Sequence, residues 1–199
     1  MLAKLDYQPE RSALQEFSAR FVELNALNRE ISSEAALDTN IKAQQLSFGS
    51  AQDAANRMAA ALTRIRSGGN AQAHAMAGEA LAAVREIQVL EAPHIAAAQD
   101  AAMDHLEQQM RTEEALVRKN LAALAGTASS RPAAMEASRE FEAFMKVHSN
   151  ILQLSRRNSN VRSLALTLGK RHTLAAQCEE RLRSIQQVLE KRDLSPSTR

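Results

Sequence analysis

Histidines and carboxylates are the first candidates for chemistry in this sequence, because these side chains bind metal ions and transfer protons. One Glu-x-x-His spacing occurs, from Glu91 to His94. Helical bundles that bind two iron or manganese ions use two such motifs, with further inward glutamates. Here the motif is single and Pro93 lies inside it, while the neighbouring Asp104 and His105 point about 100° apart on a helix. We therefore expect no metal site and no cofactor.

The other reactive residues do not form a catalytic pattern either. The five histidines are scattered, and the sequence offers no Ser-His-Asp or Cys-His arrangement. The glycine pair Gly68-Gly69 fits neither of the common phosphate-binding loop patterns. Cys178 is the single cysteine, which excludes an intramolecular disulfide, and its place near an apolar stripe predicts a buried core residue. The sequence therefore predicts a protein that is not an enzyme.

Charge is distributed unevenly along the chain. Residues 1–154 hold 15 Lys+Arg against 19 Asp+Glu, whereas residues 155–199 hold 10 against 4, within a net charge of +2. No acid occurs between Ser155 and Gln177. A basic helix attracts nucleic acid, anionic lipid or an acidic partner, whereas the simpler interpretation is a solvated face or one lying against the acidic part of the same chain. The candidate interaction surface consists of Arg156, Arg157, Asn158, Arg162, Lys170 and Arg171.

Four polar residues lie on or beside apolar helix faces and form a candidate buried polar seam: Asn28, His148, Asn158 and His172. A polar side chain on such a face costs stability unless it finds a partner. In coiled coils a buried asparagine fixes register and oligomeric state, and we prefer this role for Asn28 and Asn158. A ligand pocket between helices and simple exposure are the alternatives.

The helices that must position these residues are visible from apolar side chains recurring at spacings of three and four. The longest such pattern covers residues 131–192, with no proline after Pro132. A continuous helix of that length would reach roughly 90 Å at 1.5 Å per residue, which is too long for a compact globule. In the chain before residue 131, glycine and proline residues mark the ends of the predicted helices. We expect helices over residues 9–47, 50–66, 71–91, 93–125 and 131–192, with a short flexible tail from about 193.

The break at Ser67–Asn70 decides between two arrangements. If it is a kink, the second and third helices form one arm of a four-helix bundle; if it is a full turn, five helices result. The arm lengths favour the kink. We therefore predict an all-α protein: an elongated antiparallel four-helix, possibly five-helix, bundle or coiled coil with a very long C-terminal helix, in a single domain over 1–199.

Composition agrees with long packed helices. The chain of 199 residues is 45% hydrophobic but only 3% aromatic, and it has no tryptophan. No apolar run is long enough to span a membrane, and the first residues lack the apolar core of a secretory signal, so we expect a cytoplasmic protein.

The predicted layout is similar to the four-helix sensory modules of bacterial chemoreceptors and sensor kinases, and to helical export chaperones of flagellar type. This resemblance is one of architecture. It implies a non-enzymatic interaction or signalling module, sensory or adaptor, that acts through helix–helix contacts with helical protein partners. We also expect a homo-oligomer, because the apolar stripe on the long last helix would otherwise stay exposed to water. A cytoplasmic chaperone that binds an amphipathic helix of a client is one alternative. A basic-helix nucleic-acid binder is the other, which the scarcity of stacking aromatics disfavours.

Overall fold

The structure is a computed structural model that describes residues 8–68 and 70–193. Every regular element in these residues is a helix, so the all-α prediction is confirmed. None of the helices described is long and apolar enough to cross a membrane. The predicted tail beyond residue 193 lies outside the described residues.

The contacts between residues divide the chain into two compact units, where the sequence analysis expected one domain. We call Asp38–Val161 the central unit, and Met1–Leu37 with Arg162–Arg199 the terminal unit. Each is described by itself.

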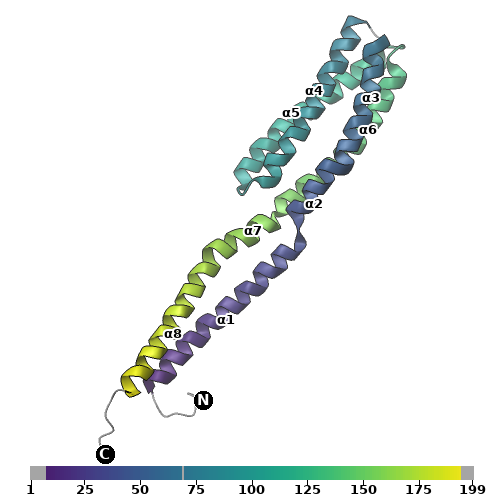
Figure 1. Cartoon of the computed structure of the whole chain (residues 1–199). Coiled ribbons are helices and arrows are strands. Elements are labelled where there is room, and N and C mark those ends of the chain that lie inside the picture. Colours follow the sequence, from purple (N-terminus) through teal and green to yellow (C-terminus); the bar gives the residue numbers. More distant parts are fainter. Residues whose placement is uncertain (1–7, 69, 194–199) are drawn as a thin grey trace, which may run out of the picture. The chain divides into compact units, whose positions relative to one another are not determined.

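The central unit contains four helical arms that pack side by side (Figure 1). The first arm is composite, because α2 continues through a π-helical turn, η2, into α3. This arm lies against both α4 and α6, and α5 lies against α4 and α6. The arms are α2 (Thr39–Leu46), η2 (Ser47–Ala51) and α3 (Gln52–Gly68); α4 (Ala71–Ala96); α5 (Asp100–Gly126); and α6 (Arg131–Arg157).

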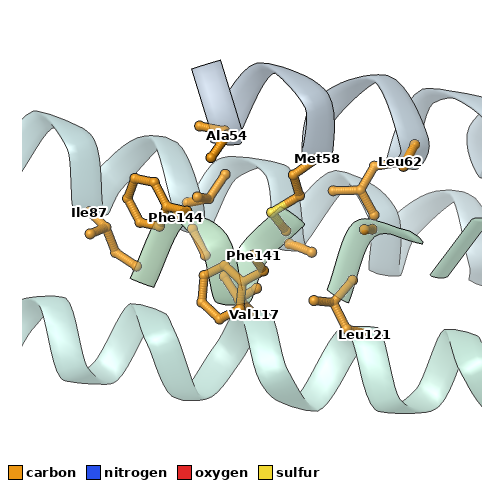
Figure 2. Close-up of a cluster of buried hydrophobic side chains, with 14 of the residues drawn as sticks. Ala54, Met58, Leu62, Ile87, Val117, Leu121, Phe141 and Phe144 are labelled. Carbon is orange, nitrogen blue, oxygen red and sulfur yellow. The ribbon is translucent and has the colours of Figure 1, made fainter. Parts of the chain in front are cut away.

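One apolar core runs between these arms, as Figure 2 shows. Phe141 and Phe144 of α6 stack with 6.2 Å between ring centroids. Alanines fill many of the other inward positions and let the helices approach closely. Burial of each large apolar side chain contributes about 1.5–3 kcal/mol, so this core is the main source of stability in the unit. The labelled core residues are Ala54, Met58, Leu62, Ile87, Val117, Leu121, Phe141 and Phe144.

The two glycine-containing breaks in this region differ from the prediction, which ended a helix before Gly49 and preferred a kink at Ser67–Asn70. At Gly49 (φ −102°, ψ −105°) the chain is kinked but stays helical, because η2 joins α2 to α3. The helix α3 ends at Gly68, and α4 begins at Ala71 and packs against α3, so the preferred kink is wrong. Asn70 caps α4 by accepting a hydrogen bond from the Ala73 backbone N–H at 2.9 Å. Pro93 lies in the last part of α4, which runs on to Ala96.

The continuous helix predicted over 131–192 is also wrong, because the chain is broken at Asn158. This residue adopts the left-handed conformation (φ 55°), which ends α6 and precedes α7 (Ser159–Leu166). Asparagine tolerates that conformation better than most residues. A second π-helical turn, η3 (Thr167–Arg171), then leads into α8 (His172–Asp193).

The terminal unit pairs α1 (Gln8–Leu37) with η3 and α8 in antiparallel orientation. An ion pair joins Glu16 to Arg181 at 3.0 Å, and Asn28 Oδ1 accepts a hydrogen bond from Arg171 Nε at 2.9 Å. Few apolar side chains are buried between these helices: Leu27, Leu174, Cys178 and Ile185.

Candidate functional site: a buried polar network in the central unit

The central unit contains a group of buried polar side chains that α4 and α6 contribute in pairs. Glu91 and His94 lie three residues apart on α4 and therefore on one face of that helix. His148 and Ser155 lie seven apart on α6. The residues are at most 3% exposed. Buried polar groups must find partners inside the protein, and these do so in two separate halves.

The first half centres on Glu91. One carboxylate oxygen, Oε1, lies 2.8 Å from Nδ1 of His148, and the other accepts a hydrogen bond from the Ser47 hydroxyl. A carboxylate only accepts, so Nδ1 carries a proton. The His148 ring is also stacked on Phe144, with 5.8 Å between centroids. Glu91 and Phe144 thereby fix both the tautomer and the orientation of this imidazole.

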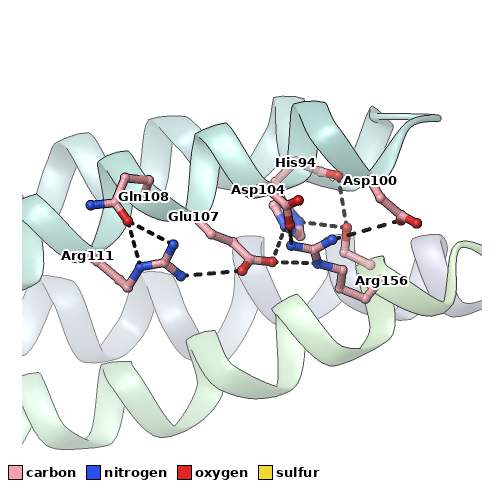
Figure 3. Close-up of polar contacts among 8 residues, drawn as sticks. His94, Asp100, Asp104, Glu107, Gln108, Arg111 and Arg156 are labelled. Carbon is pink, nitrogen blue, oxygen red and sulfur yellow. Dashed lines mark hydrogen bonds and ion pairs between the residues drawn. The ribbon is translucent and has the colours of Figure 1, made fainter.

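The second half centres on His94 (Figure 3). Its Nε2 lies 3.0 Å from Glu107 Oε1, and its Nδ1 lies 2.8 Å from the Ser155 hydroxyl oxygen. Glu107 also accepts a hydrogen bond from Arg156 Nε at 2.6 Å. Hydrogen bonding to Arg156 lowers the pKa of Glu107 to about 2, against an opposing effect of burial. Glu107 is therefore ionised at neutral pH, and His94 Nε2 must carry a proton to bond to it.

The hydroxyl of Ser155 accommodates both charge states of His94. Burial lowers the pKa of His94 below 6.5, against the opposing hydrogen bond to Glu107. When the ring is neutral, its Nδ1 accepts a hydrogen bond from the Ser155 hydroxyl. If the ring is protonated, Nδ1 becomes a donor, and the hydroxyl can turn to the His94 backbone carbonyl at 2.9 Å. Arg156 and His148 face the ring as well, and both oppose its positive charge.

This arrangement places a serine, a histidine and a glutamate in the order of a hydrolase triad. Ser155 is fully buried, however, so a substrate cannot reach its hydroxyl. Among the residues that the structure describes, no three His, Cys, Asp or Glu side chains are grouped as metal ligands. Glu91 and His94 turn to different partners despite their Glu-x-x-His spacing. The network takes residues from all four arms and is suited to holding them in one register.

A second polar group joins the starts of α2 and α7. The backbone N–H of Thr39 donates to the Ser159 hydroxyl at 3.1 Å, and the N–H of Ser159 donates to Thr39 Oγ1 at 3.0 Å. One residue further on, Asn40 and Asn160 exchange the same pair of bonds through their side-chain Oδ1 atoms, at 3.1 and 3.2 Å. Each helix thus receives its N-terminal caps from the other helix. We call these four residues the double cap.

The residue preceding each half of the double cap is left-handed: Asp38 (φ 50°) and Asn158 (φ 55°). Asn158 is buried, accepts a hydrogen bond from Asn40 Nδ2 at 2.8 Å and donates to the Ala97 carbonyl at 2.9 Å. Asp38 accepts from Asn160 Nδ2 at 3.1 Å. These bonds stabilise the break between α6 and α7, because the side-chain oxygen and the side-chain nitrogen of Asn158 both find partners there.

The candidate interaction surface does not form one patch within either unit. Arg156 is engaged in ion pairs with Asp104 and Glu107. Asn158 is buried in the double-cap region, and Arg157 is exposed. The other three cations belong to the terminal unit, where Arg171 binds Asn28 and the remaining two are exposed: Arg162 and Lys170.

The candidate polar seam is also divided. His148 and Asn158 are buried, and Asn28 is half-buried. His172 is exposed, so its assignment to a buried seam is wrong. The five-residue π-helical turn η3 precedes it and shifts the helical phase, so that Leu174 faces inward instead.

Sequence reasoning missed Ser155, Glu107 and the double cap. The one available signal was the likeness of two short segments, Asp38-Thr39-Asn40 and Asn158-Ser159-Asn160. Comparisons with known proteins add no parallel: no family model, curated protein or solved structure matches the chain.

Proposed function

We propose that this protein is a non-enzymatic interaction or signalling module that acts through helix–helix contacts and self-associates through its terminal unit. The observation that carries the proposal is a set of large apolar side chains on that unit which its own helices leave exposed. Their exposed fractions lie between 45% and 70%: Phe21, Val22, Leu164, Leu168 and Leu182.

Two helices can bury only the faces that they turn toward each other. Leu164 and Leu168 are four residues apart, which places them on one face of the helical segment that contains them. Phe21 stacks on Phe17 at 5.6 Å and forms a second apolar surface on α1. Single exposed apolar residues are ordinary, but several on one pair of helices are typical of surfaces that further helices cover. A second copy of the chain would supply such helices in matched form.

The central unit complements this role. Its apolar core is closed among its own four arms, which we interpret as an antiparallel bundle, and its polar network fixes their register. In this proposal the central unit is the rigid domain of a sensory or adaptor protein.

Sedimentation over a wide concentration series tests the proposal. We expect the wild type to self-associate, and we expect Leu168→Gln with Leu182→Gln to weaken association without lowering the melting temperature. Val89→Gln is the matched control, because Val89 is 64% exposed on the central unit. A wild type that stays monomeric throughout, or a control that weakens association equally, would contradict the proposal.

A second candidate is the chaperone that binds a client helix. It is favoured by a groove of about 300 Å³ on the central unit, where Phe48 (70% exposed) and Ile41 form one wall and Ala92 and Ala96 the other. An amphipathic helix could lay its apolar face there. Phe48→Ser would abolish client binding under this alternative, yet leave self-association unchanged. The nucleic-acid alternative gains no support, because Arg156 is occupied by carboxylates.

A further inference from the structure

A cavity of about 210 Å³ lies between α5 and α6, beside the buried polar network. Its lining includes one histidine, two methionines and three charged side chains: His148, Met110, Met145, Glu107, Arg111 and Glu114. Met110 belongs to α5, whereas Met145 and His148 lie one helical turn apart on α6. Both helices therefore contribute a thioether to the same small space.

His148 presents an unusual nitrogen to this cavity. The ring is 97% buried, and Nδ1 is held by Glu91, but Nε2 has no hydrogen-bond partner among the described residues. His94, the other buried histidine of the network, has both nitrogens bonded. Among the described residues, only Gln177 Oε1 is a fully buried side-chain nitrogen or oxygen without a partner, so His148 Nε2 keeps contact with solvent. His148 also lines the cavity, and its unbonded, accessible nitrogen can therefore reach a ligand held there.

The charged lining groups are already committed to other partners. Glu107 is bound by Arg156 and lies 3.5 Å from Arg111, and Glu114 is bound by Arg118 at 2.8 Å. The uncharged donors of the lining are one imidazole nitrogen, two thioether sulfurs and the hydroxyl of Ser149. The imidazole and the two thioethers form a neutral and soft ligand set, which selects Cu(I) over hard cations such as Mg²⁺ or Ca²⁺.

Glu91 supports the imidazole from the side opposite Nε2. It is fully buried and accepts hydrogen bonds from His148 Nδ1 and the Ser47 hydroxyl. The Glu91–His148 pair has the arrangement in which a carboxylate orients a metal-binding imidazole and raises its basicity.

We propose that His148 Nε2, Met110 and Met145 bind one soft monovalent metal ion, Cu(I), in this cavity, with Glu91 and Ser47 orienting the imidazole. The site goes beyond the helix-contact function proposed above and does not depend on it.

The test uses the full chain with ¹³C-methyl-labelled methionine and Ag(I) as a redox-inert probe, followed by Cu(I) with a competing chelator. We expect one equivalent to shift the methyl signals of Met110 and Met145, while those of Met58 and Met103, which lie outside the cavity, stay in place. Absence of a shift at Met110 and Met145 would overturn the proposal.

Two pairs of variants sharpen the test. Met110→Leu with Met145→Leu nearly conserves volume, so the fold is kept while binding is lost. Met58→Leu with Met103→Leu is the matched control and keeps binding. Ser47→Ala should weaken binding about 10- to 100-fold through the loss of imidazole orientation. Cys178→Ala tests the one thiol of the chain. Affinity unchanged by the Met110/Met145 variant, or lost on removal of Cys178, would contradict the site.

Discussion

The central and terminal units are both helical, yet they bury their side chains to very different extents. In the central unit, aromatic and aliphatic side chains from all four arms are fully enclosed, and charged residues as deep as Glu91 find partners. In the terminal unit, few side chains are buried, and leucines such as Leu168 stay exposed. The helices of the central unit have several helical neighbours, whereas α1 and α8 pack mainly on each other within the terminal unit.

This difference predicts that the terminal unit opens more readily than the central unit. Local opening occurs where few apolar contacts are buried and many backbone hydrogen bonds are solvent-exposed. A pair of helices that opens readily is also the part that a partner can order most easily. The predictions below test the contrast, from the largest expected effect to the smallest.

A matched pair of phenylalanine substitutions tests the contrast most directly. Phe144→Ala removes a fully buried ring and should lower the free energy of unfolding of the central unit by about 3–5 kcal/mol. Phe21→Ala removes a ring that is 47% exposed and should change stability by about 0.5 kcal/mol or less in a monomeric sample. Amide hydrogen exchange, read separately in each unit, measures both. If either substitution lowered the free energy of opening equally in both units, the two units would unfold as one.

Two asparagines that looked equivalent in the sequence should respond differently. Asn158→Ala places alanine in a left-handed conformation, at about 1–2 kcal/mol. It also removes one of the hydrogen bonds of Asn40 and the side-chain bond to the Ala97 carbonyl, at about 1–2 kcal/mol more. Asn28→Ala loses one bond to the exposed Arg171 and should cost under about 0.5 kcal/mol.

Asn158→Gly separates the two causes in Asn158, because glycine adopts the left-handed conformation without strain. It should recover the backbone part of the loss only. Thermal unfolding of the three variants gives the values. A neutral Asn158→Ala would mean that the double cap tolerates the loss of its neighbour.

Acid should destabilise the central unit in two separate pH windows. The folded protein holds the pKa of His94 below the 6.5 expected when unfolded, so the unfolded chain binds the proton more readily. Stability therefore falls as the pH drops through 6.5 toward the lower, folded pKa. Glu107 is also lowered, from 4.5 to about 2, so its contribution is present above 4.5 and is lost between these values.

Melting temperatures measured across the pH range check both windows. His94→Gln should remove the first loss, and Arg156→Gln should reduce the second, because Arg156 is the main cause of the low pKa of Glu107. His172→Gln serves as the control, since His172 is exposed in the terminal unit. A His94→Gln variant that keeps the first loss would assign it to another histidine.

The smallest effect is expected at the terminal unit's ion pair. Arg181 and Glu16 are both about half-exposed, so Arg181→Gln should cost no more than about 0.5 kcal/mol. Salt screens such a pair, and high ionic strength should abolish the difference between variant and wild type. Exchange rates of α1 and α8 amides measure it. A larger, salt-resistant loss would indicate that the terminal unit is better packed than its exposed side chains suggest.

The sequence was sufficient to predict helices and several of their ends, because helical periodicity is local. The start of α4 at Ala71 and the start of α6 beside Pro132 followed from residue type alone, whereas the choice between kink and turn before Ala71 did not. The break at Asn158 could not be predicted this way. An asparagine in an apolar stripe looks the same whether it continues a helix or ends one, and its partners, Asn40 and the Ala97 carbonyl, lie far away in sequence.

The candidate site shows the same limit. The Glu91–His94 spacing was visible, and it was tested only against a two-metal pattern. What those side chains do depends on His148 and Ser155, which are 57 and 61 residues away. Periodicity indicates which face of a helix is inward, but it cannot determine which inward residues of different helices meet.

The double cap also has a consequence for how the central unit could be handled as a piece of protein. Its first helix and its last begin within hydrogen-bond distance of each other, with 3.1 Å between Thr39 N and Ser159 Oγ. The chain therefore enters and leaves this unit at neighbouring points. Segments with adjoining ends are those that tolerate transplantation into a host loop or circular permutation. The segment Asp38–Val161 therefore has the geometry of a transferable insert whose two ends are hydrogen-bonded to each other by its own side chains.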